Sequence, residues 1–287
     1  MFEIVYNMAT KNLMNFKCHG CDGNTTGYKG ICPDLKLMFK NRKDGSYNEQ
    51  YDCNGKAMAF VKKYGSSYIS EIYHYLETSQ ILEQYNNKQL KIFALGCGFD
   101  PWYYAVSKYI DDNDLNINFI YVGCDNSINW NIVRPNYPNV RHEYINLTNP
   151  LNFDFNNYDF VVVDKCFSTI EKMESLEKQN TFLKNIVKGF NNINNNKKHT
   201  LIFREQARAI DLNLFDNFIN NSINWKDVIY FYIKGRDTAH INGIINYYKT
   251  LGKKVAEIYN KDIIYNRFYN NGYSRLSLNS FFIQYSI

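Results

Sequence analysis

The sequence lacks any run that approaches the ~18 consecutive apolar residues needed to span a bilayer. Its start does not resemble a signal peptide, because Glu3, Asn7 and Lys11 interrupt the apolar residues there. Neither sign of charge is in large excess, since the net charge is only +5. Hydrophobic residues nevertheless make up 45% of the chain, which favours a folded globule. We therefore expect a cytoplasmic protein with no membrane partner.

The seven cysteines are an odd number without secretory context, which favours reduced thiols or a metal site over disulfides. The two-residue spacing of Cys18 and Cys21 lets both thiolates reach one tetrahedral metal from a tight turn. Cys32 and Cys53 follow at intervals that resemble those of a four-thiolate zinc site. Zinc bound by these four cysteines is one prediction, and a set of unrelated buried thiols is the alternative.

The chain divides into three parts by pattern. Residues 1–54 show almost no periodicity, and we expect an irregular, cysteine-bearing segment there, a candidate zinc module. Residues 55–88 carry helical spacing and predict a helical cap of two helices, separated at Gly65-Ser66. Residues 89–287 predict one α/β domain, and residues 207–235 are expected to be an insertion in it because they do not fit its alternation, with residues 228–233 as a candidate added strand.

Within that domain, apolar runs alternate with helical patterns, which favours an open, mostly parallel sheet. The expected strands are residues 90–95, 117–122, 140–145, 158–164, 200–204, 253–259 and 280–287, and the expected helices are residues 101–110, 170–190 and 240–251. The helix–glycine–strand unit near the end, with one more strand after it, indicates an antiparallel last strand beside its neighbour. The fold class predicted is a Rossmann-like α/β sheet with helices on both faces.

A glycine turn after the first of these strands is the clearest candidate site. Gly96 allows a tight turn, and Gly98 lets the backbone approach a ligand closely. Pro101 suits the first position of the following helix. A dinucleotide fingerprint would need a third glycine at this same position, so a nicotinamide or flavin cofactor is disfavoured. The phosphate-binding pattern of P-loop proteins is absent from the sequence.

With these residues, the chain resembles the class I S-adenosylmethionine-dependent methyltransferases over residues 90–287. The resemblance is carried by Leu95-Gly96-Cys97-Gly98-Phe99-Asp100, by Asp125 after the second strand, by Asp164 at the end of the fourth, and by the final strand pair. Two positions depart from the family pattern. Ala94 replaces its acidic residue, and Asp100 replaces its third glycine.

The resemblance implies S-adenosylmethionine as cofactor and a role for each matching residue. The implied cofactor-binding residues are Gly96, Cys97, Gly98, Asp100, Asp125, Asn126, Asn146, Leu147 and Asp164. In this scheme Asp125 binds the ribose hydroxyls, and Asp100 is a candidate partner of the methionine amino group. Asp125 and Asp164 also have a simpler interpretation, as caps of the segments that follow them.

The implied catalytic residues are Asp164 and Lys165, which would face the methyl group and the acceptor. Asp164 is the first candidate for a base, and Glu205 and His240 follow. The acceptor stays open between RNA and a small molecule. Residues 235–287 carry seven Lys or Arg against three Asp or Glu, which is compatible with RNA. A non-catalytic subunit that binds the cofactor or a partner is the further alternative, because the glycine loop is degenerate.

Overall fold

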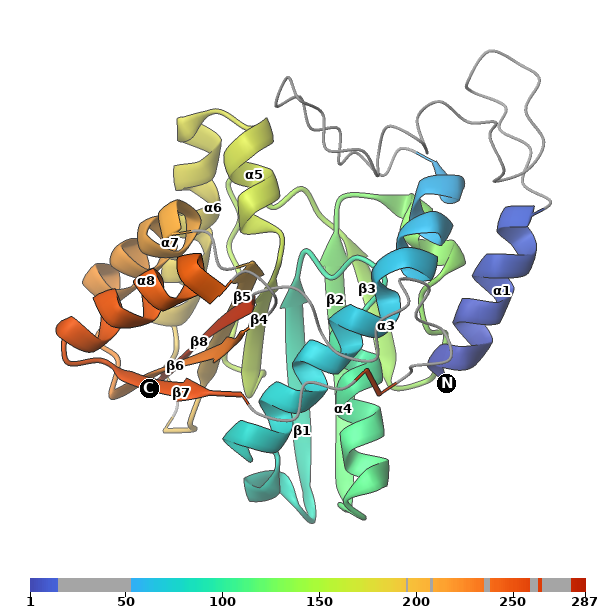
Figure 1. Ribbon diagram of the computed structural model, residues 1–287, viewed down its shortest axis with the longest axis horizontal. Helices are drawn as coiled ribbons and strands as arrows, with labels where there is room; N and C mark the ends of the chain where they lie inside the picture. Colours follow the sequence, from blue (N-terminus) through green and yellow to red (C-terminus); the bar gives the residue numbers. More distant parts are fainter. Residues whose placement is uncertain (15–52, 195, 207–208, 235–237, 259–262, 265–279) are drawn as a thin grey trace.

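The computed structural model in Figure 1 describes residues 1–14, 53–194, 196–206, 209–234, 238–258, 263–264 and 280–287. Its helices are α1 (Phe2–Met14), α3 (Asn54–Ser79), α4 (Pro101–Asp112), α5 (Phe167–Met173), α6 (Leu176–Asn191), α7 (Ala209–Ser222) and α8 (Thr238–Thr250), with short 3-10 turns η1 (Glu83–Tyr85) and η2 (Ile128–Ile132). Its strands are β1 (Lys88–Leu95), β2 (Ile117–Asp125), β3 (Val140–Tyr144), β4 (Phe160–Asp164), β5 (Thr200–Gln206), β6 (Asp227–Ile233), β7 (Lys254–Glu257) and β8 (Ser280–Ser286).

All eight strands form one sheet in the order β3-β2-β1-β4-β5-β8-β6-β7. Strand β8 runs antiparallel to both of its neighbours, β5 and β6, and every other neighbouring pair is parallel. The strand order reverses between β1 and β4, since the chain first builds outward to β3 and then returns. The predicted Rossmann-like sheet with an antiparallel last strand is confirmed.

Helices cover both faces of the sheet and bury a separate core on each (Figure 1). On one face, α1, α3 and α4 pack over β1 and β2. On the other face, α6, α7 and α8 pack over β4, β5, β6 and β8. Strand β4 lies between these layers with every residue buried, which explains its β-branched sequence.

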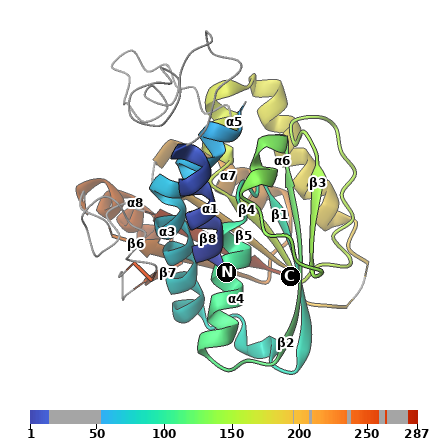
Figure 2. The same cartoon turned by 90° about the vertical axis from the view of Figure 1, so that its right-hand side faces the viewer.

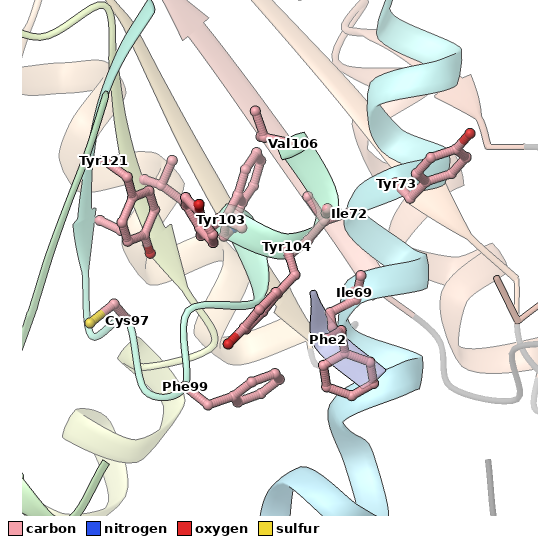
Figure 3. Packing of buried hydrophobic residues seen from close by; sticks show 14 of the residues in the cluster. Phe2, Ile69, Ile72, Tyr73, Cys97, Phe99, Tyr103, Tyr104, Val106 and Tyr121 are labelled. Atoms are coloured by element: carbon pink, nitrogen blue, oxygen red, sulfur yellow. The ribbon is translucent and has the colours of Figure 1, made fainter. Parts of the chain in front are cut away.

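Two segments before the sheet differ from the prediction. Residues 2–14, expected to be irregular, form helix α1, which lies along α3 in both views (Figures 1 and 2). Residues 55–88 were expected to hold two helices separated at Gly65-Ser66, but one helix, α3, runs through this point, and Gly65 does not break it. A Cβ on Gly65 would lie 2.8 Å from Cζ of Phe2, so this glycine serves the close approach of α1. Figure 3 shows Phe2 beside Ile69 of α3.

Two further segments also differ from the prediction. Residues 207–235, predicted as an insertion with a candidate added strand at residues 228–233, supply α7 and β6, and β6 is an inner strand paired with β7 and β8. The single helix predicted over residues 170–190 is two helices, because Ser175 accepts a hydrogen bond from the backbone N–H of Lys178 and begins α6. None of the described helices is long and apolar enough to cross a membrane.

Candidate functional site

A cavity of about 500 Å³ opens at the carboxyl ends of β1, β2, β3 and β4. This is where the strand order reverses, the position at which open α/β sheets bind ligands. Segments after all four strands contribute to the wall, together with helices α3 and α5. The residues that line it include Phe60, Tyr68, Gly96, Cys97, Gly98, Phe99, Asp125, Asn126, Trp130, Asn146, Leu147, Asp164, Lys165 and Glu174.

The turn after β1 needs glycine at both predicted positions. Gly96 has φ 66° and Gly98 has φ 53°, in the left-handed region that side chains disfavour. A Cβ on Gly96 would also lie 2.7 Å from Sγ of Cys166. Between the two glycines, the N–H of Cys97 donates to the carbonyl of Cys124 at 3.0 Å, which ties the turn to the end of β2.

Asp125 ends β2 and faces the cavity beside this turn. Its Oδ2 accepts a hydrogen bond from the N–H of Gly98 at 3.0 Å, and its Oδ1 accepts one from the N–H of Ser127 at 3.0 Å. The bond to Ser127 is a local contact with the loop that follows β2, while the bond to Gly98 joins two strand ends. Burial raises the pKa of the Asp125 carboxyl, and the N–H of Ser127 opposes that shift. Each oxygen keeps a second lone pair that can accept from a ligand hydroxyl.

The other residues predicted for the cofactor line the same cavity, with one exception. Asn126 is exposed after β2, and Asn146 and Leu147 follow β3. Asn146 uses its Oδ1 to accept from the N–H and hydroxyl of Thr148, at 3.0 and 2.8 Å, which fixes the loop beside Leu147. The exception is Asp100, which is fully buried and does not line the cavity.

Asp164 lies at the end of β4 with its carboxylate held from behind. Its Oδ1 accepts from Nε of Arg204 on the neighbouring strand β5. Its Oδ2 has no hydrogen-bond partner among the described residues. Burial raises the pKa of the Asp164 carboxyl, while the Arg204 guanidinium opposes that shift. Asp164 therefore presents an oriented carboxylate to the cavity, with one oxygen available to a ligand.

Lys165 also lines the cavity, but its ammonium is engaged within the protein. Nζ donates to Oε2 of Glu71 at 2.7 Å and lies 3.9 Å from the centroid of the Tyr68 ring, and the side chain is only 4% exposed. Burial lowers the pKa of the Lys165 ammonium, and the Glu71 carboxylate opposes that shift. The backbone at Lys165 is left-handed, with φ 49°, and its N–H donates to the carbonyl of Arg204.

Aromatic residues from distant parts of the chain form one wall of the cavity. Phe60 and Tyr68 come from α3, Phe99 from the glycine turn and Trp130 from η2. The ring of Phe60 lies 5.7 Å from that of Trp130, 6.1 Å from that of Phe99 and 5.4 Å from that of Tyr68, centroid to centroid. Periodicity places the α3 residues on an apolar face, but cannot show that this face meets the turn.

The remaining candidates lie elsewhere. Cys18, Cys21 and Cys32 are outside the described residues, and Cys53 is partly exposed at the start of α3. Within the described residues, no group of three or more His, Cys, Asp or Glu side chains could hold a metal ion, so zinc stays a prediction.

Neither secondary candidate for a base gains support. Glu205 is buried, and its Oε2 accepts from the N–H of Ser168 at the start of α5. The side chain of His240 is outside the described part of the structure.

No protein family model matches the chain, and no curated protein matches it. Among solved structures, it is similar to the plantazolicin methyltransferase BpumL in complex with SAH, at 9% identity and a TM-score of 0.43, over 99% of this chain and 97% of that chain. A TehB-like SAM-dependent methyltransferase from Corynebacterium glutamicum matches at 11% identity and a TM-score of 0.39, over 77% and 96%. The citrinin polyketide synthase CMeT domain matches at 12% identity and a TM-score of 0.40, over 87% of this chain but only 58% of that chain.

These identities and scores are too low to indicate a function. The fold itself follows from the topology. An antiparallel strand lies between β5 and β6, a glycine turn follows β1, and an acidic residue ends β2. The chain therefore has the Rossmann-like fold of class I S-adenosylmethionine-dependent methyltransferases.

Proposed function

We propose that the cavity binds S-adenosylmethionine and that the chain transfers its methyl group to a small-molecule acceptor. One observation carries the cofactor assignment. The Asp125 carboxylate is fixed by the N–H of Gly98 at the cavity wall, where it can accept hydrogen bonds from a pair of ribose hydroxyls. Asn146, Leu147, Gly96 and Gly98 line the same cavity; the first two would flank the adenine, and the two glycines would pack under the rest of the cofactor.

The charges of the described lining favour a small-molecule acceptor over RNA. Asp125, Asp164 and Glu174 are acidic, and Lys165 is the one cationic side chain of that lining. Its ammonium already pairs with Glu71, so the described wall offers no uncommitted cation to a phosphate. The aromatic wall provides apolar contact instead, as is usual for small-molecule pockets.

Methyl transfer from a sulfonium depends mainly on alignment of the nucleophile, methyl carbon and sulfur. Asp164 is the residue that we assign to the acceptor, because its Oδ2 is available while Arg204 holds its Oδ1. A raised carboxyl pKa suits a group that accepts a proton from a hydroxyl or ammonium acceptor. Because the Lys165 ammonium already pairs with Glu71, we assign its side chain to supporting the cavity wall.

Calorimetry with S-adenosylhomocysteine tests the cofactor assignment. We expect micromolar binding to the wild type and a loss of about tenfold to a hundredfold in Asp125→Asn, since a hydrogen bond to a charged group contributes about 1.5–3 kcal/mol. Asp154→Asn is a matched control, because Asp154 is exposed on another loop. The absence of binding to the folded wild type would refute the proposal.

A labelled-methyl assay tests the acceptor. Label from S-adenosylmethionine should enter a metabolite fraction and not a total-RNA fraction of the same extract. Transfer into RNA would contradict the small-molecule assignment. Cofactor binding without transfer to either fraction would favour the non-catalytic subunit.

A further inference from the structure

We propose that Arg134 is a positioning residue that braces the glycine turn from the side opposite the cavity, with Asp100 as its buried counter-charge. The inference rests on the proposed function, since the ligand that profits from the turn is the cofactor. Arg134 follows η2 and is 6% exposed, and it was not among the residues indicated by the sequence. Its role is distinct from that of Asp125, because its guanidinium contacts the protein and not the cavity.

The guanidinium uses all three of its nitrogens. Nε donates to the carbonyl of Gly98 at 2.8 Å, Nη2 donates to Sγ of Cys97 at 3.2 Å, and Nη1 donates to Oδ1 of Asn131 at 3.2 Å. Two of these partners are the central residues of the turn. The planar fork of arginine suits this task, because one rigid group fixes two adjacent residues at once.

Asp100 explains why a cation is stable in this position. It is fully buried, and its Oδ2 lies 3.9 Å from Nε of Arg134 and 2.7 Å from Nε2 of His142 on β3. Its backbone has φ 63°, the conformation that a glycine adopts easily. Asp100 thus keeps the backbone shape of the family's third glycine, while its side chain supplies a charge behind the turn.

Arg134 and Asp125, the candidate ribose-binding residue, both bind Gly98. Gly98 accepts from Arg134 through its carbonyl and donates to Asp125 through its N–H. Loss of the first bond lets Gly98 rotate and moves the N–H that orients the Asp125 carboxylate. Arg134 therefore acts on cofactor affinity through Gly98, without touching the ligand.

The test compares Arg134→Lys, Arg134→Ala and the control Arg141→Ala by calorimetry with S-adenosylhomocysteine. Arg141 is an exposed arginine on β3, paired with Glu143, and its removal should leave the dissociation constant unchanged. Arg134→Ala should weaken binding by about tenfold, and Arg134→Lys should be intermediate because one of its donors can reach Gly98. Guanidinium ion, well below denaturing concentrations, should restore binding to Arg134→Ala and not to Asp125→Asn.

Amide hydrogen exchange of Gly98 provides a readout that needs no ligand. It should be faster in Arg134→Lys than in the wild type. A folded Arg134→Lys with wild-type binding and wild-type exchange would overturn the inference. If the wild type binds no S-adenosylhomocysteine, the proposed function fails, and the exchange rate alone decides whether the brace exists.

Discussion

Replacing Glu71 by alanine is expected to lower the free energy of unfolding by about 3–5 kcal/mol, the effect of removing one partner from a buried ion pair. Glu71 is fully buried on α3. Its Oε2 accepts from Nζ of Lys165 at 2.7 Å, from Nη1 of Arg204 at 3.3 Å and from the hydroxyl of Ser280 at 2.8 Å. Without it, two buried cations share the single carboxylate of Asp164.

This loss should be larger than for any exposed acid on the same helix. Glu77→Ala is the matched control, because Glu77 is partly exposed and pairs only one turn away, with His74. Urea unfolding, followed by circular dichroism, measures both variants. The double variant Glu71→Ala with Lys165→Met restores the charge balance and should lose less than the sum of its two single variants, with a coupling energy of about 0.5–3 kcal/mol. A loss below about 1 kcal/mol in Glu71→Ala would contradict the prediction, because it is the size expected for a solvent-exposed ion pair.

Gly96→Ala is expected to reduce S-adenosylhomocysteine affinity by about tenfold to a hundredfold, because a shifted turn displaces the N–H of Gly98 that orients Asp125, and a hydrogen bond to a charged group contributes about 1.5–3 kcal/mol. The new Cβ would lie 2.7 Å from Sγ of Cys166, and φ at this position is 66°. The left-handed conformation alone costs roughly 1–2 kcal/mol for an alanine. The turn must shift away from Cys166. This shift also strains the backbone hydrogen bond from the N–H of Cys97 to the carbonyl of Cys124.

Gly243→Ala is the control for this substitution. Gly243 lies inside α8, and a Cβ there would meet nothing within 4 Å. Because alanine favours a helix interior, this variant should gain about 0.5–1 kcal/mol in the free energy of unfolding. Calorimetry and urea unfolding of both variants separate the two cases. A Gly96→Ala protein with wild-type affinity would show that the turn does not support the cofactor.

The features that could be predicted from the sequence depend on neighbouring residues. The run before Gly96 has the apolar sequence of a buried strand, and Gly96 and Gly98 indicate the turn that follows it. The β-branched residues of β4 indicate burial on both faces. In each case the local backbone preference and the tertiary environment agree, so a short window is sufficient.

The features that could not be predicted depend on contacts across the chain. Gly65 resembles a helix break until Phe2 is known to pack against it. Glu71 and Lys165 are separated by 94 positions, and nothing in either segment indicates the other. Asp100, at the position of the family's third glycine, was expected to face the cofactor as a candidate partner of the methionine amino group. Its carboxylate instead contacts Arg134 and His142 and does not line the cavity.

The position of β8 has a consequence for synthesis. Its residues come after β6 and β7 in the chain, yet the strand lies between β5 and β6. During translation, the facing edges of β5 and β6 stay unpaired until residues 280–286 have left the ribosome. Open strand edges of this kind are templates for pairing with other chains. A nascent chain of this protein therefore exposes two unpaired strand edges until β8 is inserted between two parts of the sheet that precede it in the sequence.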